Sequence, residues 1–217
     1  MSVNNNLIAN LREDYKAKTL DIPDVLAHPI PQFEKWFKEA LDADIKEANA
    51  MTLATVANQT PSARIVLLKG VDKKGLYFYT NYESRKGREV QTNPNVALVF
   101  FWKELERQVR VEGTIKKISK KKSSLYFQSR PKGSQIGAWA SPQSHVIPDR
   151  QILSNNYQSI EDQYKDKDVL PLPSNWGGYC VHPRYMEFWQ GRSSRMHDRI
   201  CYTLKSQNKW VIERLAP

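Results

Sequence analysis

Apolar residues near the start of the chain recur at the spacing of a helix face. A short N-terminal helix is predicted by Leu7, Ile8, Leu11 and Tyr15. The segment 19–31 is rich in proline and lacks this period, so we expect it to form an extended loop. Residues 1–30 are therefore expected to form a helix followed by an extended arm.

The clearest amphipathic pattern of the chain lies in the next segment. One face of a predicted helix carries Phe33, Trp36, Phe37, Ala40, Leu41 and Ile45. Pro31 stands just before this helix, where proline is tolerated because the first N–H groups have no partner within a helix. We predict that the apolar face packs against a core.

Runs of β-forming residues, separated by turn residues, fill the middle of the chain. The predicted strands are 50–57, 63–71, 76–80, 96–102 and 108–118. Ser84 is a candidate N-cap for a short helix that runs to about Thr92, where Asn93 and Pro94 end it.

Two further helices and four short strands complete the pattern. Helices are predicted at 120–129, before Pro131, and at 152–164. The last predicted strands are 178–181, 186–190, 199–204 and 210–215. About nine strands without strand–helix–strand alternation predict a mostly β, α+β protein. We expect one domain over 1–217, a closed or partly closed antiparallel barrel with helices packed outside.

The composition is that of a globular protein with an affinity for anions. Of 217 residues, 40% are hydrophobic and 26% are charged, with a net charge of +10. This charge suits nucleic acid, an acidic membrane or phosphorylated small molecules. Residues 1–14 lack the apolar core of a secretory signal. We expect Cys180 and Cys201 to be buried and reduced in a cytoplasmic protein.

The densest group of chemically active side chains is Arg195-Met196-His197-Asp198-Arg199. If this stretch is extended, Arg195, His197 and Arg199 share one face, because side chains two apart in a strand point the same way. Two arginines and an imidazole suit a planar, anionic ligand. The alternative is a solvated edge strand.

Two segments nearer the start combine cations with strand ends. Arg64 and Lys69 bracket an apolar run, and in a regular strand they would face opposite ways unless a bulge intervenes. The segment 79–87 joins a strand to a helix start with hydroxyls, free backbone amides and an Arg-Lys pair, which suit a phosphate. The alternatives are solvated strand ends and a capped helix.

A further candidate for phosphate binding is the set Tyr126, Arg130 and Ser134. Tyr126 and Arg130 are four apart and share a helix face, while Ser134 lies beyond Pro131. The alternative is a packed tyrosine beside a surface arginine. The four histidines lack metal-ligand spacing, so we expect no metal site. The sequence has no phosphate-binding P-loop, and the lysines of 116–122 read as a solvated face.

The ordered motifs of the chain resemble those of the pyridoxamine 5′-phosphate oxidases. The matching stretches are RIVLLK (64–69), FYTNYESRKG (78–87), ERQVRVEG (106–113), YFQSRPKGSQIGAWAS (126–141), PLPSNWGGY (171–179), EFWQGRSSRMHDR (187–199) and RLAP (214–217). The resemblance covers residues 11–217. It departs from the family pattern at Glu47-Ala48-Asn49, where many members have Asp-Pro, and at Met196, where leucine is usual.

The resemblance implies a homodimeric split β-barrel with flanking helices that holds FMN in clefts between subunits. Implied FMN contacts are Arg64, Ile65, Val66, Leu67, Leu68, Lys69, Tyr79, Thr80, Arg85, Lys86, Gln108, Gln143, Ser144, Trp189 and Arg199. Implied contacts to the substrate phosphate are Lys69, Tyr126, Arg130 and Ser134. Arg195 and His197 are implied as catalytic residues over the pyridine ring, and Arg12 to Tyr15 as residues that approach the substrate as part of a mobile lid.

The implied reaction is oxidation of pyridoxamine 5′-phosphate or pyridoxine 5′-phosphate to pyridoxal 5′-phosphate, with hydride transfer to flavin and reoxidation by oxygen. Three alternatives stay open. One is a flavin split-barrel oxidoreductase with another substrate. The second is a carrier of pyridoxal phosphate without flavin. The third is a basic nucleic-acid-binding domain, which only the charge supports.

Overall fold

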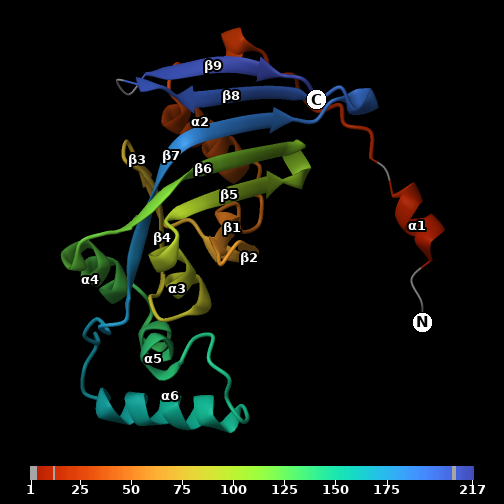
Figure 1. The fold of residues 1–217 in the computed structure, drawn as a ribbon. Helices are drawn as coiled ribbons and strands as arrows, with labels where there is room; N and C mark the ends of the chain where they lie inside the picture. The colour runs from red at the N-terminus through yellow and green to blue at the C-terminus, as the bar shows by residue number, and fades with distance from the viewer. Residues whose placement is uncertain (1–3, 12, 207–208) are drawn as a thin grey trace. The chain divides into compact units, whose positions relative to one another are not determined.

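The computed structural model describes residues 4–11, 13–206 and 209–217 (Figure 1). Its α-helices are α1 (Asn5–Asn10), α2 (Pro29–Asp42), α3 (Arg85–Thr92), α4 (Lys120–Gln128), α5 (Lys132–Ala140) and α6 (Gln151–Gln163). Short 3-10 helices lie at Ile22–Asp24, Lys103–Leu105 and Ser193–Arg195. Among the described residues, no helix combines the length and the apolar character needed to cross a bilayer.

The strands form an antiparallel sheet. They are β1 (Ala50–Ala57), β2 (Thr60–Leu67), β3 (Gly70–Asp72), β4 (Gly75–Asn81), β5 (Asn95–Trp102), β6 (Arg107–Lys117), β7 (Trp176–Gln190), β8 (Asp198–Leu204) and β9 (Trp210–Leu215). Hydrogen bonds connect them in the order β2-β1-β5-β6-β7-β4-β3, while β8 pairs with β7 and β9. The prediction of a mostly β, antiparallel α+β protein is confirmed.

The chain divides into two compact units. Unit 1 contains Met1–Ala48, Val99–Val111 and Tyr185–Pro217, and unit 2 contains Asn49–Leu98 and Glu112–Arg184. Strands β5, β6 and β7 contribute residues to both units. The expectation of a single domain stays a prediction.

The core of unit 1 is built on the apolar face of α2. Phe33 and Trp36 of this helix are almost fully buried. Their rings lie 5.0 Å from Phe100 of β5 and 5.2 Å from Phe188 of β7, respectively. Burial of such large aromatic groups removes much apolar surface from water, which stabilises the unit. The predicted amphipathic helix is thereby confirmed.

Unit 2 combines three strand pairings with four α-helices. β1 pairs with β2, and β4 pairs with β3 and with the first half of β7. Ser84 caps α3 by accepting a hydrogen bond from the Gly87 amide, as the sequence predicts. Beyond the sheet, α5 and α6 lie side by side (Figure 1). A cluster of Phe127, Ile136, Leu170 and Trp176 forms the core beneath them.

The structure differs from the predicted elements at several places. The N-terminal helix ends at Asn10, so Leu11 and Tyr15 lie beyond it. The predicted strand 63–71 ends at Leu67 and resumes at Gly70. Strands predicted at 178–181 and 186–190 are one strand, β7, in which Pro183 lies between the stretches that pair with β4 and with β8. Helix α5 was not predicted. It begins directly after Pro131, which stands at its N-cap, whereas α4 already ends at Gln128. Both cysteines are buried and free, as expected.

Candidate active site

Several residues selected from the sequence line one cavity of about 300 Å³ in unit 2. Its walls are Ile65, Val66, Leu67, Lys69, Tyr79, Thr80, Lys86, Tyr126, Arg130, Gln143 and Trp176. Lys69 reaches this cavity because the chain leaves β2 at Leu67, and its amide bonds the Tyr77 carbonyl at 2.8 Å. The volume falls within the range of small-molecule sites.

The lining of this cavity includes a side-chain amide flanked by a hydroxyl and an ammonium. The Oε1 atom of Gln143 lies 3.2 Å from the Thr80 hydroxyl and 3.4 Å from Lys86 Nζ. Burial lowers the pKa of Lys86, and the nearby charge of Arg64 lowers it further. A cation held partly desolvated binds an anion more strongly than one in water. The group of Thr80, Lys86 and Gln143 therefore suits a phosphate.

Arg130 lines the same cavity and has a donor that no described residue uses. Its guanidinium carbon lies 4.8 Å from the centroid of the Trp176 ring. Its Nη1 atom is buried and has no hydrogen-bond partner among the described residues. Burial lowers the pKa of this guanidinium. An unpaired buried donor is costly, so an anionic ligand at this position is favoured.

Ser134 and Arg130 line a second cavity together. This cavity, of about 330 Å³, is lined by Asn81, Arg130, Ser134, Gly137, Ala138, Ser141, Gln143 and Trp176. Lys69, Tyr126, Arg130 and Ser134 thus surround two cavities that share Arg130, Gln143 and Trp176. Trp176 lines both cavities and was not among the predicted site residues, although it lies within the family motif PLPSNWGGY.

Three aromatic rings form a stack along the first cavity. The Tyr79 ring lies 3.8 Å from that of Tyr126 and 5.7 Å from that of Trp176, all nearly parallel. Gly178 permits this arrangement, since a Cβ atom there would lie 2.7 Å from the Tyr79 ring. The stack gives the cavity a flat, rigid wall that suits a planar ligand.

The predicted FMN contacts of this segment do not all face the cavity. The Arg64 guanidinium instead bonds Glu89 Oε2 at 2.8 Å and the Thr55 hydroxyl. Arg85 Nε bonds the other oxygen of the same carboxylate at 2.8 Å. Leu68 has its side chain in the core. Glu89, which sequence reasoning missed, therefore holds both Arg64 of β2 and Arg85 at the start of α3.

A separate group of functional candidates lies in unit 1. The His197 ring lies 4.6 Å from Trp189 and 5.9 Å from Tyr15. Its Nδ1 atom lies 3.1 Å from the amide nitrogen of Arg192. A backbone N–H can only donate, so Nδ1 is the acceptor and the neutral ring carries its proton on Nε2. Burial, and then the charge of Arg195, lower the pKa of His197.

Arg195 does not share a strand face with His197 and Arg199. Ser194 and Arg195 have positive φ angles of 54° and 60°, and β8 begins only at Asp198. The condition for a shared strand face, an extended stretch over 195–199, is not met, because two consecutive left-handed residues make a turn. Arg195 and His197 nevertheless line one cavity of about 330 Å³, together with Leu11, Glu13, Asp14, Tyr15, Arg192 and Ser194.

The Tyr15 ring packs directly against Gly191, the residue that follows β7. A Cβ atom at Gly191 would lie 2.7 Å from the Tyr15 ring, so no larger residue fits. Tyr15 meets Trp189 edge-on, with 5.8 Å between ring centroids. Tyr15 is thus brought to His197. Arg12 lies outside the described residues.

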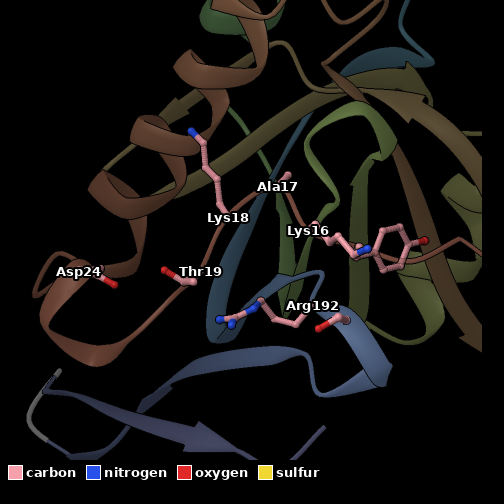
Figure 2. Close-up of a pocket in the computed structure, with 8 residues that line it drawn as sticks. Lys16, Ala17, Lys18, Thr19, Asp24 and Arg192 are labelled. Carbon is pink, nitrogen blue, oxygen red and sulfur yellow. The ribbon is translucent and has the colours of Figure 1, made fainter.

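The arm that carries Tyr15 is bound to unit 1 by its backbone. The Ala17 amide donates to Glu106 Oε2 at 2.9 Å, and the Leu20 amide donates to Asp198 Oδ2 at 3.0 Å. Figure 2 shows the cavity beside this arm, about 610 Å³ in volume. Its cations already have acidic partners, in the pairs Lys16–Asp14, Lys18–Glu39 and Arg192–Asp198. This cavity is therefore a poorer phosphate site than the one at Arg130.

The remaining predicted FMN residues are divided between the units. In unit 1, Trp189 pairs with Arg199 in the register of β7 and β8, and Gln108 is half-buried on β6. In unit 2, Ser144 is exposed, with a φ of 69°. Each unit thus brings together part of the predicted set.

Comparison with known proteins identifies the family. The family model described as pyridoxamine 5′-phosphate oxidase matches residues 37–164, and that of the pyridoxine 5′-phosphate oxidase C-terminal dimerisation region matches 176–217. A pyridoxine/pyridoxamine 5′-phosphate oxidase of Leptospira interrogans is 54% identical over 97% of this chain and 98% of its own. One from Salinibacter ruber is 53% identical over 97% and 99%.

Solved structures agree on the fold. PhzG from Burkholderia lata, in complex with tetrahydrophenazine-1-carboxylic acid, superposes with a TM-score of 0.87 at 26% identity, over 94% of this chain and 100% of its own. An FMN-binding, pyridoxamine 5′-phosphate oxidase-related protein from Nostoc punctiforme has a TM-score of 0.68 at 19% identity, over 85% and 97%, which bears on fold alone. The chain belongs to the pyridoxamine 5′-phosphate oxidase family of enzymes.

Proposed function

We propose that this enzyme uses FMN to oxidise pyridoxamine 5′-phosphate and pyridoxine 5′-phosphate to pyridoxal 5′-phosphate. Oxygen is the electron acceptor and gives hydrogen peroxide, and the amine substrate also gives ammonia. The names of relatives more than 50% identical over nearly the whole chain support this substrate class.

The observation that carries the proposal is the unpaired donor of Arg130. Its buried Nη1 atom lacks a partner among the described residues, at a wall shared with Lys69 and Tyr126. A phosphate monoester supplies charged acceptor oxygens for this donor and for the Ser134 hydroxyl. Lys69, Tyr126, Arg130 and Ser134 would hold the substrate phosphate in this way.

The FMN phosphate is assigned to the start of α3. Lys86 and Thr80 present an ammonium and a hydroxyl to the cavity, and Arg85 stands at the first position of the helix. Helix starts favour anions because their first amides are unpaired and the helix dipole is positive there. Two phosphate monoesters need two cationic groups, and unit 2 offers both.

The residues of the second group would orient the pyridine ring of the substrate. FMN, when bound, would accept the hydride that leaves carbon C4′ of the substrate. His197 is fixed as a neutral donor through Nε2, because the Arg192 amide occupies Nδ1. Arg195 provides a charge that can neutralise the phenolate oxygen of the substrate. These roles need orientation and charge, and no strong general base.

A homodimer completes the proposal. A match to a C-terminal dimerisation region over residues 176–217 supports it. We propose that FMN lies between two subunits. Size-exclusion chromatography with light scattering tests this point, and a monomer that retains flavin would contradict it.

The proposed reaction is tested with protein loaded with FMN and incubated in air. Pyridoxine 5′-phosphate should yield an aldehyde, detected with phenylhydrazine, and an equal amount of peroxide, while unphosphorylated pyridoxine should react far more slowly. Flavin binding without aldehyde from either phosphorylated substrate would contradict the substrate class. It would instead favour another flavin oxidase activity, as the likeness to PhzG allows.

A further inference from the structure

A buried carboxylate in unit 1 lies beneath Arg199 and has no role in the reaction proposed above. Glu187 of β7 is 1% exposed. It lies two residues before Trp189 on the same strand, so both side chains point to one face of the sheet. Trp189 pairs directly with Arg199 of β8. The carboxylate is therefore placed under the arginine proposed to contact FMN.

Glu187 grips this arginine with both of its oxygens. Arg199 Nε lies 2.8 Å from Oε1, and Nη2 lies 3.1 Å from Oε2. Such a two-point ion pair fixes the plane of the guanidinium as well as its position. The hydroxyl of Tyr185 holds Oε2 at 2.9 Å, and Arg110 Nη1 lies 3.2 Å from it.

The end of the chain holds the third nitrogen of the same guanidinium. Arg199 Nη1 lies 2.9 Å from the carbonyl oxygen of Ala216. Strand β9 delivers this carbonyl, because Leu215 pairs with Arg199 in the β8–β9 register and Ala216 follows directly. The terminal motif RLAP thus has a structural purpose that its sequence alone does not reveal.

These contacts leave Arg199 few free donors. Nη1 and Nη2 each carry a second hydrogen that no contact among the described residues uses. The side chain is 26% exposed, while that of Glu187 is 2% exposed. Glu187 and the Ala216 carbonyl therefore hold the guanidinium, and these contacts set the direction of its two remaining N–H donors.

The charges around Glu187 keep it ionised. Burial opposes its ionisation, but the hydrogen bonds from Arg199 and Tyr185 and the charge of Arg110 outweigh burial and hold the pKa of Glu187 below its usual value. Its hydrogen bond in turn raises the pKa of Arg199. The pair therefore stays charged over the working pH range.

We propose that Glu187 and the Ala216 carbonyl are positioning groups that fix the Arg199 guanidinium for contact with FMN. This inference rests on the proposed function, because it takes Arg199 to be a flavin contact. Glu187 touches neither flavin nor substrate in this account and acts only through Arg199. A buried ion pair with a purely structural role would affect folding without affecting flavin affinity through that arginine.

The test is a double-mutant cycle on flavin affinity. The dissociation constant of FMN is measured by quenching of flavin fluorescence on binding to apoprotein made from the holoenzyme. We compare wild type, Glu187→Gln, Arg199→Gln and the double variant. Glu187→Gln should weaken FMN binding about ten-fold in the wild-type background and less than about two-fold in the Arg199→Gln background. Glu213→Gln, which removes an exposed carboxylate from β9, is the matched control and should leave affinity unchanged.

Two further variants keep the test decisive if Glu187→Gln fails to fold. Tyr185→Phe removes one hydrogen bond to the carboxylate and should weaken FMN binding a few-fold, only when Arg199 is present. Truncation of the chain after Leu215 removes the Ala216 carbonyl and should weaken FMN binding by a similar factor. Equal effects with and without Arg199, or no effect on affinity, would overturn the inference. Failure of wild type itself to bind FMN would instead overturn the proposed function.

Discussion

Replacement of Arg130 by methionine should separate substrate binding from stability. The half-buried Arg130 lies beside Trp176, and its buried Nη1 atom has no hydrogen-bond partner among the described residues. A hydrogen bond to a charged group contributes about 1.5–3 kcal/mol. At about 1.4 kcal/mol per factor of ten, Arg130→Met should raise the KM for pyridoxine 5′-phosphate by roughly 10–150-fold.

The same change should cost little in folding. Removal of an unsatisfied buried donor recovers about 1–3 kcal/mol, while loss of the cation–π contact with Trp176 costs up to about 2 kcal/mol. Because these terms oppose each other, the net change should stay near 1 kcal/mol or below. That corresponds to a shift in melting temperature of about 2–4 °C for a chain of this size.

Steady-state kinetics and thermal unfolding of the variant measure both effects. Arg88→Met, which removes an exposed cation of α3, controls for the loss of one positive charge and should change the KM little. Activity on unphosphorylated pyridoxine should not change in Arg130→Met. A large fall in melting temperature with an unchanged KM would refute the assignment, because Arg130 would then be a structural residue.

Three other changes test separate parts of the account. His197→Gln keeps a donor near the Nε2 position and His197→Asn does not, so kcat should be at least about ten-fold higher in the Gln variant. In the wild-type enzyme, the acid limb of the pH profile of kcat/KM should lie below the usual histidine pKa of about 6.5, because the pKa of His197 is lowered. This limb should vanish in both variants. Gly178→Ala places a Cβ atom 2.5 Å from Ile118 and 2.7 Å from Tyr79, so calorimetry should show a loss of about 1–3 kcal/mol. The pKa of Glu89 is lowered, so its contribution to stability is present above the unfolded value near about 4.3 and is lost as pH falls through the lower folded pKa; Glu89→Gln should flatten this part of the acid-unfolding curve measured by circular dichroism.

Local signals in the sequence predicted the elements that depend on near neighbours. The Ser84 cap, the strand at 50–57 and the apolar face of α2 are confirmed, because each is determined by residues within a few turns or along one strand. Residue chemistry predicted Tyr126, Arg130 and Ser134 as a candidate phosphate site, and the family motifs added Lys69. Tyr126 and Arg130 line one cavity and Arg130 and Ser134 line the other, because α4, the turn after it and the start of α5 follow one another directly.

Features that depend on distant side chains escaped prediction. The bond between Arg64 and Glu89 joins residues 25 positions apart, and no local pattern indicates it. The left-handed backbone at Ser194 and Arg195 makes a turn without a glycine, so the sequence carries no turn signal there. The role of Ala216 depends on a backbone carbonyl, which has no sequence signature.

The central claim is that bound flavin takes electrons from a phosphorylated B6 vitamer held by Arg130 and its neighbours. The most direct measurement mixes FMN-loaded protein with pyridoxine 5′-phosphate in the absence of oxygen and follows the visible absorbance of the flavin. The account predicts bleaching, and recovery of the colour with release of peroxide when air is admitted. Flavin that stays oxidised with both pyridoxine 5′-phosphate and pyridoxamine 5′-phosphate would contradict it.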